Sequence, residues 1–276
     1  MSLLPQPVVT TDAIVLRAWP TGETSVVAAL LTARCGQLRV IAKGARGAGS
    51  VLRSLVQPGR LVSVECGLDP RRQLQYLRAG GVLLDPLAAD NSLERTAFLL
   101  AGLELAELCR PAGERETGLF ELCREFLAML SCAPREGAAR LFYAFELALL
   151  QLHGLAPVLE GCAACDSPLP RAPGATARFS PVAGGVICGD CAAAGRGRDG
   201  RSLAWETLAG LRALAGGPAA AVGCAAPAWR ERETGIVLHG FLGYHLPGYR
   251  LPAALAMLRA GRPPATGAAG GAGEEA

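Results

Sequence analysis

The first 82 residues show the two-residue alternation of apolar and polar positions that is typical of β-strands. In the clearest run, Leu38, Val40 and Ala42 fall on one face of the chain, whereas Arg39 and Lys43 fall on the other. Short turn sequences of hairpin type separate neighbouring runs. We therefore predict strands at residues 12–19, 24–32, 37–43, 60–66 and 73–79. Five such short strands fit a small barrel of the OB type, and an SH3-like barrel is the alternative.

From residue 83 onward the apolar positions recur every three or four residues, which is the period of an amphipathic helix. One such stripe runs from Leu141 to Leu152, and Gly154 followed by Pro157 supplies the signals that end a helix. Another begins at Asn91, a capping residue type that is followed three positions later by Glu94. We predict helices at residues 91–109, 117–131, 135–153, 202–215, 229–245 and 252–259.

Four cysteines interrupt the helical pattern as two Cys-x-x-Cys pairs, Cys162 with Cys165 and Cys188 with Cys191. This spacing is typical of a zinc site with four cysteine ligands, in which the thiolates fill a tetrahedral shell and leave no position for water or substrate. We therefore expect one structural Zn²⁺ in a zinc ribbon at about residues 158–195. Two disulfides or four unrelated thiols are the competing interpretations.

Together these patterns predict an α+β protein of several domains, with an N-terminal five-stranded OB-fold barrel followed by an α-helical domain. The barrel is expected at residues 1–82, and the helical domain with its inserted four-cysteine zinc ribbon at residues 83–260. Residues 261–276 are mostly Gly, Ala and Pro and end near two glutamates, so we expect a disordered tail there.

Composition restricts where such a protein could work. Although 51% of the residues are hydrophobic, no apolar run reaches the roughly 18 residues of a membrane span. The first residues lack the basic and apolar regions of a signal peptide. Ten cysteines without a secretion signal indicate a reducing compartment, in which thiols bind metal or pack as small apolar groups. We expect a cytoplasmic protein without membrane contact.

The net charge of +3 conceals an uneven distribution along the chain. Residues 1–80 carry ten basic and four acidic side chains, whereas residues 81–161 carry six basic and twelve acidic ones. A basic barrel joined to an acidic helical block suggests one surface for a polyanion and another for proteins. Ordinary fluctuation of surface charge is the alternative explanation.

A basic, glycine-rich loop from Lys43 to Arg53 follows the third predicted strand. Glycines let a backbone approach a phosphate closely, and OB barrels bind oligonucleotides across this strand and its neighbouring loops. Because aromatic residues are sparse here, binding should be mainly electrostatic and sequence-tolerant. A solvated flexible loop is the alternative. The candidate DNA-binding residues are Arg17, Arg34, Arg39, Lys43, Arg46 and Arg53.

No pattern in the chain favours an enzyme. The sequence contains no phosphate-binding Gly-x-x-x-x-Gly-Lys-Ser/Thr loop, nucleophile elbow or paired-carboxylate motif. The three histidines, His153, His239 and His245, show no metal-binding spacing with acidic partners, so we expect capping, packing or surface roles for them. We therefore predict no catalytic residues and no small-molecule substrate.

Several segments carry a resemblance to a known family. In the first domain they are Ala13-Ile-Val-Leu-Arg17, Gly22-Glu23 and Ala42-Lys-Gly-Ala-Arg46. In the second they are Arg140-x-Phe142, Glu146-x-x-Leu149 and the two cysteine pairs. In this combination and order the chain resembles the RecO family of recombination mediators over nearly its whole length to about residue 260. It departs from the family at Gly47-Ala-Gly49, where further basic residues are common, and this thins the charge of the loop.

The resemblance implies an OB domain and a helical domain with a zinc ribbon. It also implies a bacterial protein of the nucleoid that binds and anneals single- and double-stranded DNA. RecR is the expected partner in loading RecA onto strands that are coated by single-stranded-DNA-binding protein. RecO relatives receive the acidic C-terminal tail of that coating protein, so its site needs local arginines, for which Arg124, Arg140 and Arg212 are the candidates.

Two other classes of function compete with a recombination mediator. In a structural adaptor, the barrel would contact only protein and the charge asymmetry would be incidental. A zinc hydrolase or nuclease is disfavoured because a full shell of four thiolates leaves no open coordination position and no carboxylate cluster is present. DNA binding with steep salt dependence would separate the mediator from the adaptor.

Overall fold

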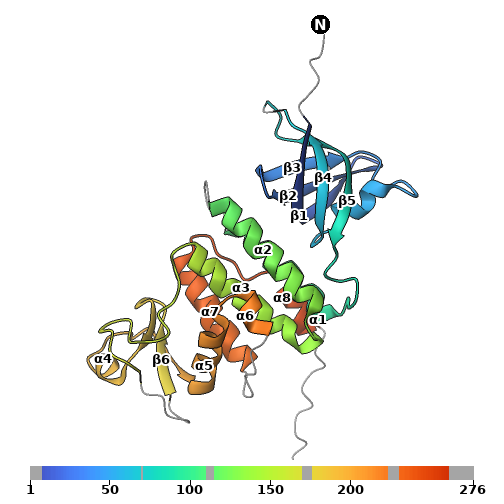
Figure 1. Ribbon diagram of the computed structural model, residues 1–276. Coiled ribbons are helices and arrows are strands. Elements are labelled where there is room, and N and C mark those ends of the chain that lie inside the picture. Colours follow the sequence, from blue (N-terminus) through green and yellow to red (C-terminus); the bar gives the residue numbers. More distant parts are fainter. Residues whose placement is uncertain (1–7, 70, 110–114, 170–175, 223–229, 261–276) are drawn as a thin grey trace, which may run out of the picture.

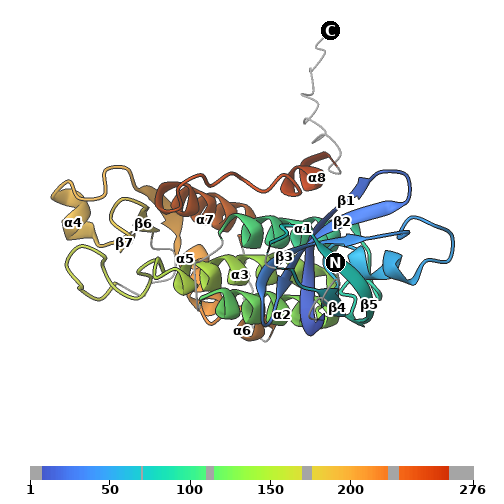
Figure 2. The same cartoon turned by 90° about the horizontal axis from the view of Figure 1, so that it is seen from above.

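The computed structural model of the chain describes residues 8–69, 71–109, 115–169, 176–222 and 230–260. Three parts follow one another in space: a β-barrel at one end, a bundle of helices in the middle and a small sheet with its loops at the other end (Figures 1 and 2). The predicted tail at residues 261–276 lies outside the described residues.

The barrel contains five strands in the order β1-β2-β3-β5-β4, and β4 closes it against β1. All neighbouring strands are antiparallel except β3 and β5, which are parallel. This is the arrangement expected of an OB fold rather than of an SH3-like barrel. The strands are β1 (Val8–Thr21), β2 (Ser25–Thr32), β3 (Gly36–Ala42), β4 (Leu61–Gly67) and β5 (Gln75–Leu84).

The barrel interior is filled by small and branched apolar side chains, including Val15, Leu30, Val40 and Val62. The predicted alternation in β3 is confirmed, because Val40 and Ala42 are buried inside the barrel while Arg39 is exposed. Between β3 and β4 the chain forms a short 3₁₀ helix, η1 (Val51–Val56), which was not predicted.

One outer face of the barrel is also buried. Ile14 and Leu16 of β1 and Ala29 and Leu31 of β2 belong to the same hydrophobic core as Phe98 of the first helix. Strand β2 is therefore apolar on both faces, as expected for a strand that is covered on both sides. The barrel and the helices share one core along this face, because burying it removes further apolar surface from water.

Helix α3 lies at the centre of the bundle, and most of the other helices pack against it. Its aromatic rings pack in tilted contacts against rings of neighbouring helices. The ring centroids of Phe142 and Phe98 are 5.3 Å apart, and those of Phe145 and Phe126 are 4.8 Å apart. The helices are α1 (Leu93–Leu108), α2 (Arg115–Cys132), α3 (Ala138–Leu152), α5 (Trp205–Leu214), α6 (Pro218–Val222), α7 (Glu231–His245) and α8 (Leu255–Ala260), and a 3₁₀ turn, η2 (Arg135–Gly137), precedes α3.

A buried arginine fastens α1 to the end of α2. The guanidinium of Arg95 donates to the carbonyl oxygens of Leu130 and Ala133 and forms an ion pair with Asp90 at 3.2 Å. It thereby satisfies carbonyl groups that the end of α2 leaves without helical partners. The N-cap of α1 is Ser92, whose hydroxyl accepts from the Arg95 N–H, and the predicted start at Asn91 is one residue early.

The third part is a three-stranded sheet in the order β7-β6-β8 with a single-turn helix. It comprises β6 (Thr176–Ser180), β7 (Gly185–Ile187), α4 (Gly189–Ala193) and β8 (Arg201–Ala204). The prediction of a helix from residue 202 was wrong at its start. Residues 201–204 pair with β6 and bury Leu203, so the ribbon sheet extends past the predicted limit of about 195 and α5 begins at Trp205.

Candidate functional site

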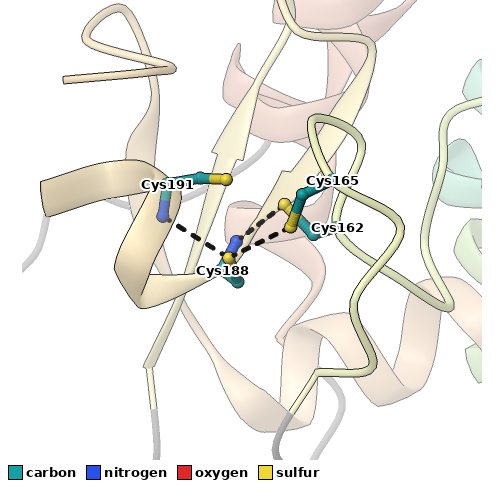
Figure 3. Close-up of side chains that lie close together, drawn as sticks. All are labelled: Cys162, Cys165, Cys188 and Cys191. Carbon is teal, nitrogen blue, oxygen red and sulfur yellow. Dashed lines mark hydrogen bonds between the residues drawn. The ribbon is translucent and has the colours of Figure 1, made fainter. Parts of the chain in front are cut away.

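The two cysteine pairs converge although twenty-two residues separate them in the sequence. Cys162 and Cys165 lie in the loop that precedes the sheet, Cys188 follows β7, and Cys191 lies in α4. Their four sulfur atoms all lie within 4.8 Å of one another and point toward a common centre (Figure 3). Within the described residues, this is the one group of three or more Cys, His, Asp or Glu side chains arranged to hold a metal ion.

Backbone N–H groups are directed at these sulfurs. The Cys188 N–H donates to the Cys162 sulfur at 3.3 Å, and the Cys191 N–H donates to the Cys188 sulfur at 3.5 Å (Figure 3). Hydrogen bonds of this kind stabilise a thiolate over a thiol. The short turn from Cys188 to Cys191 therefore both positions the second cysteine and directs an N–H group at the sulfur of the first.

The thiols of the cluster differ in the direction in which their pKa values are shifted. Burial acts to raise the pKa of Cys162, but hydrogen bonds from the Cys188 and Ala164 N–H groups bring that pKa down to about 6. Hydrogen bonding to Ser167 lowers the pKa of Cys165. The neighbouring sulfur of Cys165 and then burial raise the pKa of Cys191 to about 12. Four crowded sulfurs cannot all ionise without a cation, so a divalent ion would release protons on binding.

The geometry fits a tetrahedral metal centre and does not fit disulfides. Cys165 and Cys188 have sulfur atoms 3.7 Å apart. Sulfurs placed about 2.3 Å from a zinc ion at the corners of a tetrahedron are about 3.8 Å apart, whereas a disulfide is about 2.05 Å long. The four cysteines thus form a site that could bind a metal ion with every coordination position filled by protein.

The helical bundle holds the ribbon firmly. Phe179 of β6 packs against Phe241 of α7 with ring centroids 5.7 Å apart, and both side chains are buried. The Arg212 guanidinium donates twice to the Leu159 carbonyl oxygen, at 2.9 and 2.7 Å, and lies over the Trp205 ring. Arg212, predicted as a partner-binding residue, is therefore engaged in joining α5 to the ribbon.

The other two candidates for partner binding lie on different helices. Arg124 is exposed on α2 and forms an ion pair with Glu121 at 2.6 Å. Arg140 is half-buried near the start of α3. All three arginines stay candidates for partner binding, and Arg212 has a structural role as well.

A groove of about 820 Å³ in the helical domain was not identified from the sequence. Its rim carries Ile236 and Leu251, which are 41% and 42% exposed, and the cation Arg232. Its floor includes Tyr143 and His239. Exposed apolar side chains around a concave surface are typical of a site that binds a ligand or a peptide.

A buried carboxylate lies beneath this groove. Glu146 of α3 is fully buried, and its Oε1 lies 3.3 Å from Nδ1 of His239, which also contacts the Tyr249 hydroxyl at 2.8 Å. Burial raises the pKa of Glu146, and the hydrogen bond and charge of His239 oppose that rise. The carboxylate also raises the pKa of Tyr143, after the larger effect of burial.

On the barrel, the basic loop lies beside a second cationic segment, residues 71–78, which the sequence analysis did not connect with it. The Lys43 ammonium lies 4.9 Å from the centre of the Tyr76 ring, and the Arg72 guanidinium lies 5.9 Å from the same ring. The parallel pairing of β3 with β5 brings these residues together. Arg71 and Arg78 are exposed in the same segment. The Arg71-Arg72 pair was visible in the sequence, but only the long-range pairing places it next to Lys43.

The loop itself is anchored rather than open. The Arg53 side chain donates to the carbonyl oxygens of Arg46 at 2.7 Å and of Gly47 at 3.3 Å. The Arg46 N–H donates to the Thr24 carbonyl at 2.8 Å and its guanidinium to the Gly22 carbonyl at 3.3 Å. Arg53 therefore shapes the loop, while Lys43 and Arg46 are exposed on it.

The remaining predicted DNA-binding residues lie on the strands and at the far turn. The register places Arg17 and Arg39 on either side of Ala29, so the two arginines flank one strand on the same outer face. Arg17 is 60% exposed, lies 5.2 Å from the Trp19 ring centre and is 3.5 Å from Glu107. Arg34 lies in the turn between β2 and β3, at the end of β3 away from Lys43, and is exposed there.

In the portions of the chain that the structure describes, no helix combines the length and apolar character that crossing a membrane requires.

Comparison with known proteins places both halves of the chain in one group. The family model described as "Recombination protein O N terminal" matches residues 6–83, and "Recombination protein O C terminal" matches residues 90–253. A protein named DNA repair protein RecO from Anaeromyxobacter dehalogenans (strain 2CP-C) is 38% identical over 244 residues, which are 87% of this chain and 92% of that protein. Proteins of the same name from Pelotomaculum thermopropionicum and Myxococcus xanthus are 33% and 30% identical, over 85% and 87% of this chain and 88% and 93% of their own length.

Proposed function

Since this chain belongs to the RecO family of DNA repair proteins, we propose that it is a non-enzymatic, DNA-binding mediator of recombinational repair. In this role it binds and anneals single strands and works at the bacterial nucleoid. Together with RecR, it helps to load RecA onto DNA that is coated by single-stranded-DNA-binding protein.

The cationic surface of the barrel is the observation that supports this proposal best. Lys43 and Arg46 are exposed on the anchored loop, and Arg72 approaches Lys43 across Tyr76. Side chains of this kind contact phosphates and hold a DNA backbone without reading its bases. These side chains lie outside the core that the barrel shares with the helices, so the packing of the two parts leaves them available to DNA.

Measurement of DNA affinity against salt concentration tests the proposal. The affinity of the protein for single- and double-stranded oligonucleotides should fall steeply as salt rises, because each phosphate contact releases counterions. If neither DNA form binds at low salt, the chain is a protein-binding adaptor and the mediator role is excluded.

For the metal centre, we propose one structural Zn²⁺ held by Cys162, Cys165, Cys188 and Cys191. Thiolate ligands in a closed tetrahedral shell favour zinc over harder cations such as magnesium or calcium. No catalytic step is assigned to this ion, because four protein ligands leave no position for a substrate. Elemental analysis of the purified protein should find one zinc per chain.

For the helical domain, we propose that the 820 Å³ groove receives the C-terminal tail of single-stranded-DNA-binding protein. Its apolar rim suits an apolar chain end, and Arg232 offers a cation to an acidic tail. In the full-length protein, Ile236→Glu and Leu251→Glu should weaken binding of the tail peptide, measured by fluorescence anisotropy. The matched control is Val182→Glu, which alters an exposed valine in the ribbon. Unchanged binding in both groove variants would move the site to Arg124 or Arg140.

A further inference from the structure

A second groove, of about 570 Å³, lies on the barrel between the end of β1 and the basic loop. Trp19 and Pro20 form one wall, and Arg46, Arg53, Gln57 and Pro58 form the other. Of the described residues that line it, none is acidic. The groove thus presents an indole and the Arg46 guanidinium to a ligand, while the Arg53 guanidinium and the Gln57 carboxamide donate to backbone carbonyl groups beside it.

The groove exists because β1 is longer than its pairing with β4. Residues Val8–Ile14 pair with β4, and the last such contacts join Val15 to Gly59 and Arg60 through backbone hydrogen bonds of 2.8 and 3.0 Å. Beyond this point, within the described residues, β1 has a strand partner only on the β2 side. The other edge of β1 is not paired with a strand there, and Gln57 and Pro58, which follow η1, form the opposite wall of the groove.

The cationic wall is held in place before any ligand arrives. Arg46 is tied to the turn between β1 and β2 by its backbone hydrogen bond to Thr24, and Arg53 is tied to the carbonyl of Arg46. The Arg17 guanidinium lies over the Trp19 ring, 5.2 Å from its centre, and is paired with Glu107 at 3.5 Å, so it helps to hold the indole in place. A preorganised aromatic surface with surrounding cations complements a base that carries a phosphate on either side.

We propose that this groove accepts an unpaired nucleobase of single-stranded DNA, stacked against Trp19, while Arg46 contacts a neighbouring phosphate. The inference rests on the proposed DNA binding and adds to it a preference for single-stranded over double-stranded DNA. A base inside a duplex is stacked and paired, so it cannot enter the groove, whereas an unpaired base can. Lys43 and the other exposed cations bind both DNA forms, and Trp19 distinguishes them.

The test compares the affinities of full-length protein variants for a thymidine 30-mer and for a 30-base-pair duplex. Trp19→Leu retains an apolar side chain and removes the aromatic face, so it should weaken single-strand binding about tenfold and leave duplex binding unchanged. Trp19→Phe should retain most of the preference. The matched control is Tyr244→Leu, which should change neither affinity. It alters an exposed aromatic residue of α7 next to His245, which contacts Pro181 in the ribbon.

A fluorescence readout works even if Trp19→Leu folds poorly. In a protein carrying Trp205→Phe and Trp229→Phe, Trp19 is the remaining tryptophan, since the chain has three. Stacking of a base should quench its emission on addition of the thymidine 30-mer and not on addition of the duplex. Equal quenching by both forms, or none by the single strand while DNA still binds, would overturn the stacking groove without affecting the proposed function. Absence of binding to either DNA by the wild-type protein would overturn the proposed function as well.

Discussion

Lys43 and Arg46 are exposed cations at the exit of β3, and their contacts within the protein are weak ones. Changing both to alanine should weaken single- and double-stranded DNA binding alike, because phosphate contacts do not depend on base pairing. For single strands, the slope of log affinity against log salt should flatten by about 1.4, at about 0.7 per lost contact. Stability should change little, since exposed charges contribute little to it.

The control for this double variant removes the same charge from another surface. Arg198 and Arg201 are exposed in the ribbon, at the end of the molecule away from the barrel (Figure 1). Changing both to alanine should leave the barrel's affinity and salt slope close to the wild type. A folded Lys43→Ala/Arg46→Ala protein with the wild-type salt slope would remove these two residues from the DNA site.

Glu146 provides a pH-dependent prediction at the residue scale. Its pKa is raised in the folded protein by burial, so the unfolded chain loses this proton at a lower pH than the folded one. The contribution of Glu146 to the free energy of unfolding is therefore fully present below the ordinary glutamate pKa of about 4.3. It declines as the pH rises from there through the raised pKa of the folded protein. Glu146→Gln cannot ionise and should escape this decline. Relative to the wild type, its free energy of unfolding in urea should therefore increase between about pH 4.5 and pH 8.

Glu65→Gln is the matched control, because it removes a carboxylate that is exposed on β4. A free-energy difference between Glu146→Gln and the wild type that stays constant across this pH range would show that Glu146 has the same pKa in both states. It would then be the contact with His239, 3.3 Å away, that fully offsets the effect of burial.

Single residues differed in how far the sequence could identify them. The four metal-ligand candidates were predictable because each pair is local and the spacing itself states the chemistry. Arg72 was missed because only the parallel pairing of β3 with β5 brings it near Lys43. The partner-binding role of Arg212 stays a prediction, and its sequence neighbourhood could not reveal that it also donates to the Leu159 carbonyl, fifty-three residues away.

At the scale of elements, periodicity identified the strands and long helices, because each of these has one apolar face at a regular spacing. It failed for β8, whose four residues are too few to show a period and whose pairing with β6 is long-range. It also could not reveal that β2 is buried on both faces, since its outer face joins the core of the helical domain. A flexible loop was the alternative to a DNA-binding one for the glycine-rich segment, and periodicity could not show that side-chain hydrogen bonds from Arg53 anchor it.

The ribbon provides the prediction at this scale. Cys188→Ser should abolish zinc binding and destabilise the residues around the site, because a structural zinc ion stabilises its fold by several kcal/mol. The loss should remain local, since Phe179, Val186 and Leu203 of the ribbon belong to the core of the helical bundle. Elemental analysis and hydrogen exchange should therefore show a metal-free protein with increased exchange at residues 158–169 and 185–193 and near-native exchange in α3.

Cys132→Ser is the control, because Cys132 is exposed and lies outside the cluster. It should leave both zinc content and exchange rates unchanged. A wild-type protein that lacks zinc while its thiols are reduced would rule out the metal centre. Global unfolding of Cys188→Ser would show instead that the shared hydrophobic core stabilises the fold less than the metal ion does.

At the scale of the whole molecule, the barrel, the helices and the ribbon lie in a row and share a hydrophobic core (Figures 1 and 2). The core passes from Ile14 of the barrel through Phe98 and Phe142 to Phe179 of the ribbon. Sequence patterns predicted a barrel and a helical domain with an inserted ribbon, but they carry no information on which outer faces of these parts meet. The shared core holds the cationic barrel surface and the 820 Å³ groove on one continuous body, so DNA and a protein tail could be held at the same time.

The most direct test of the mediator account is the annealing of complementary strands that are both coated with single-stranded-DNA-binding protein. We expect the wild-type protein to accelerate annealing, measured by the loss of fluorescence from a dye-labelled strand that pairs with a quencher-labelled one. The Lys43→Ala/Arg46→Ala protein should be slower, and Arg198→Ala/Arg201→Ala should match the wild type. No acceleration by a folded, zinc-loaded wild-type protein, with or without RecR, would contradict the account.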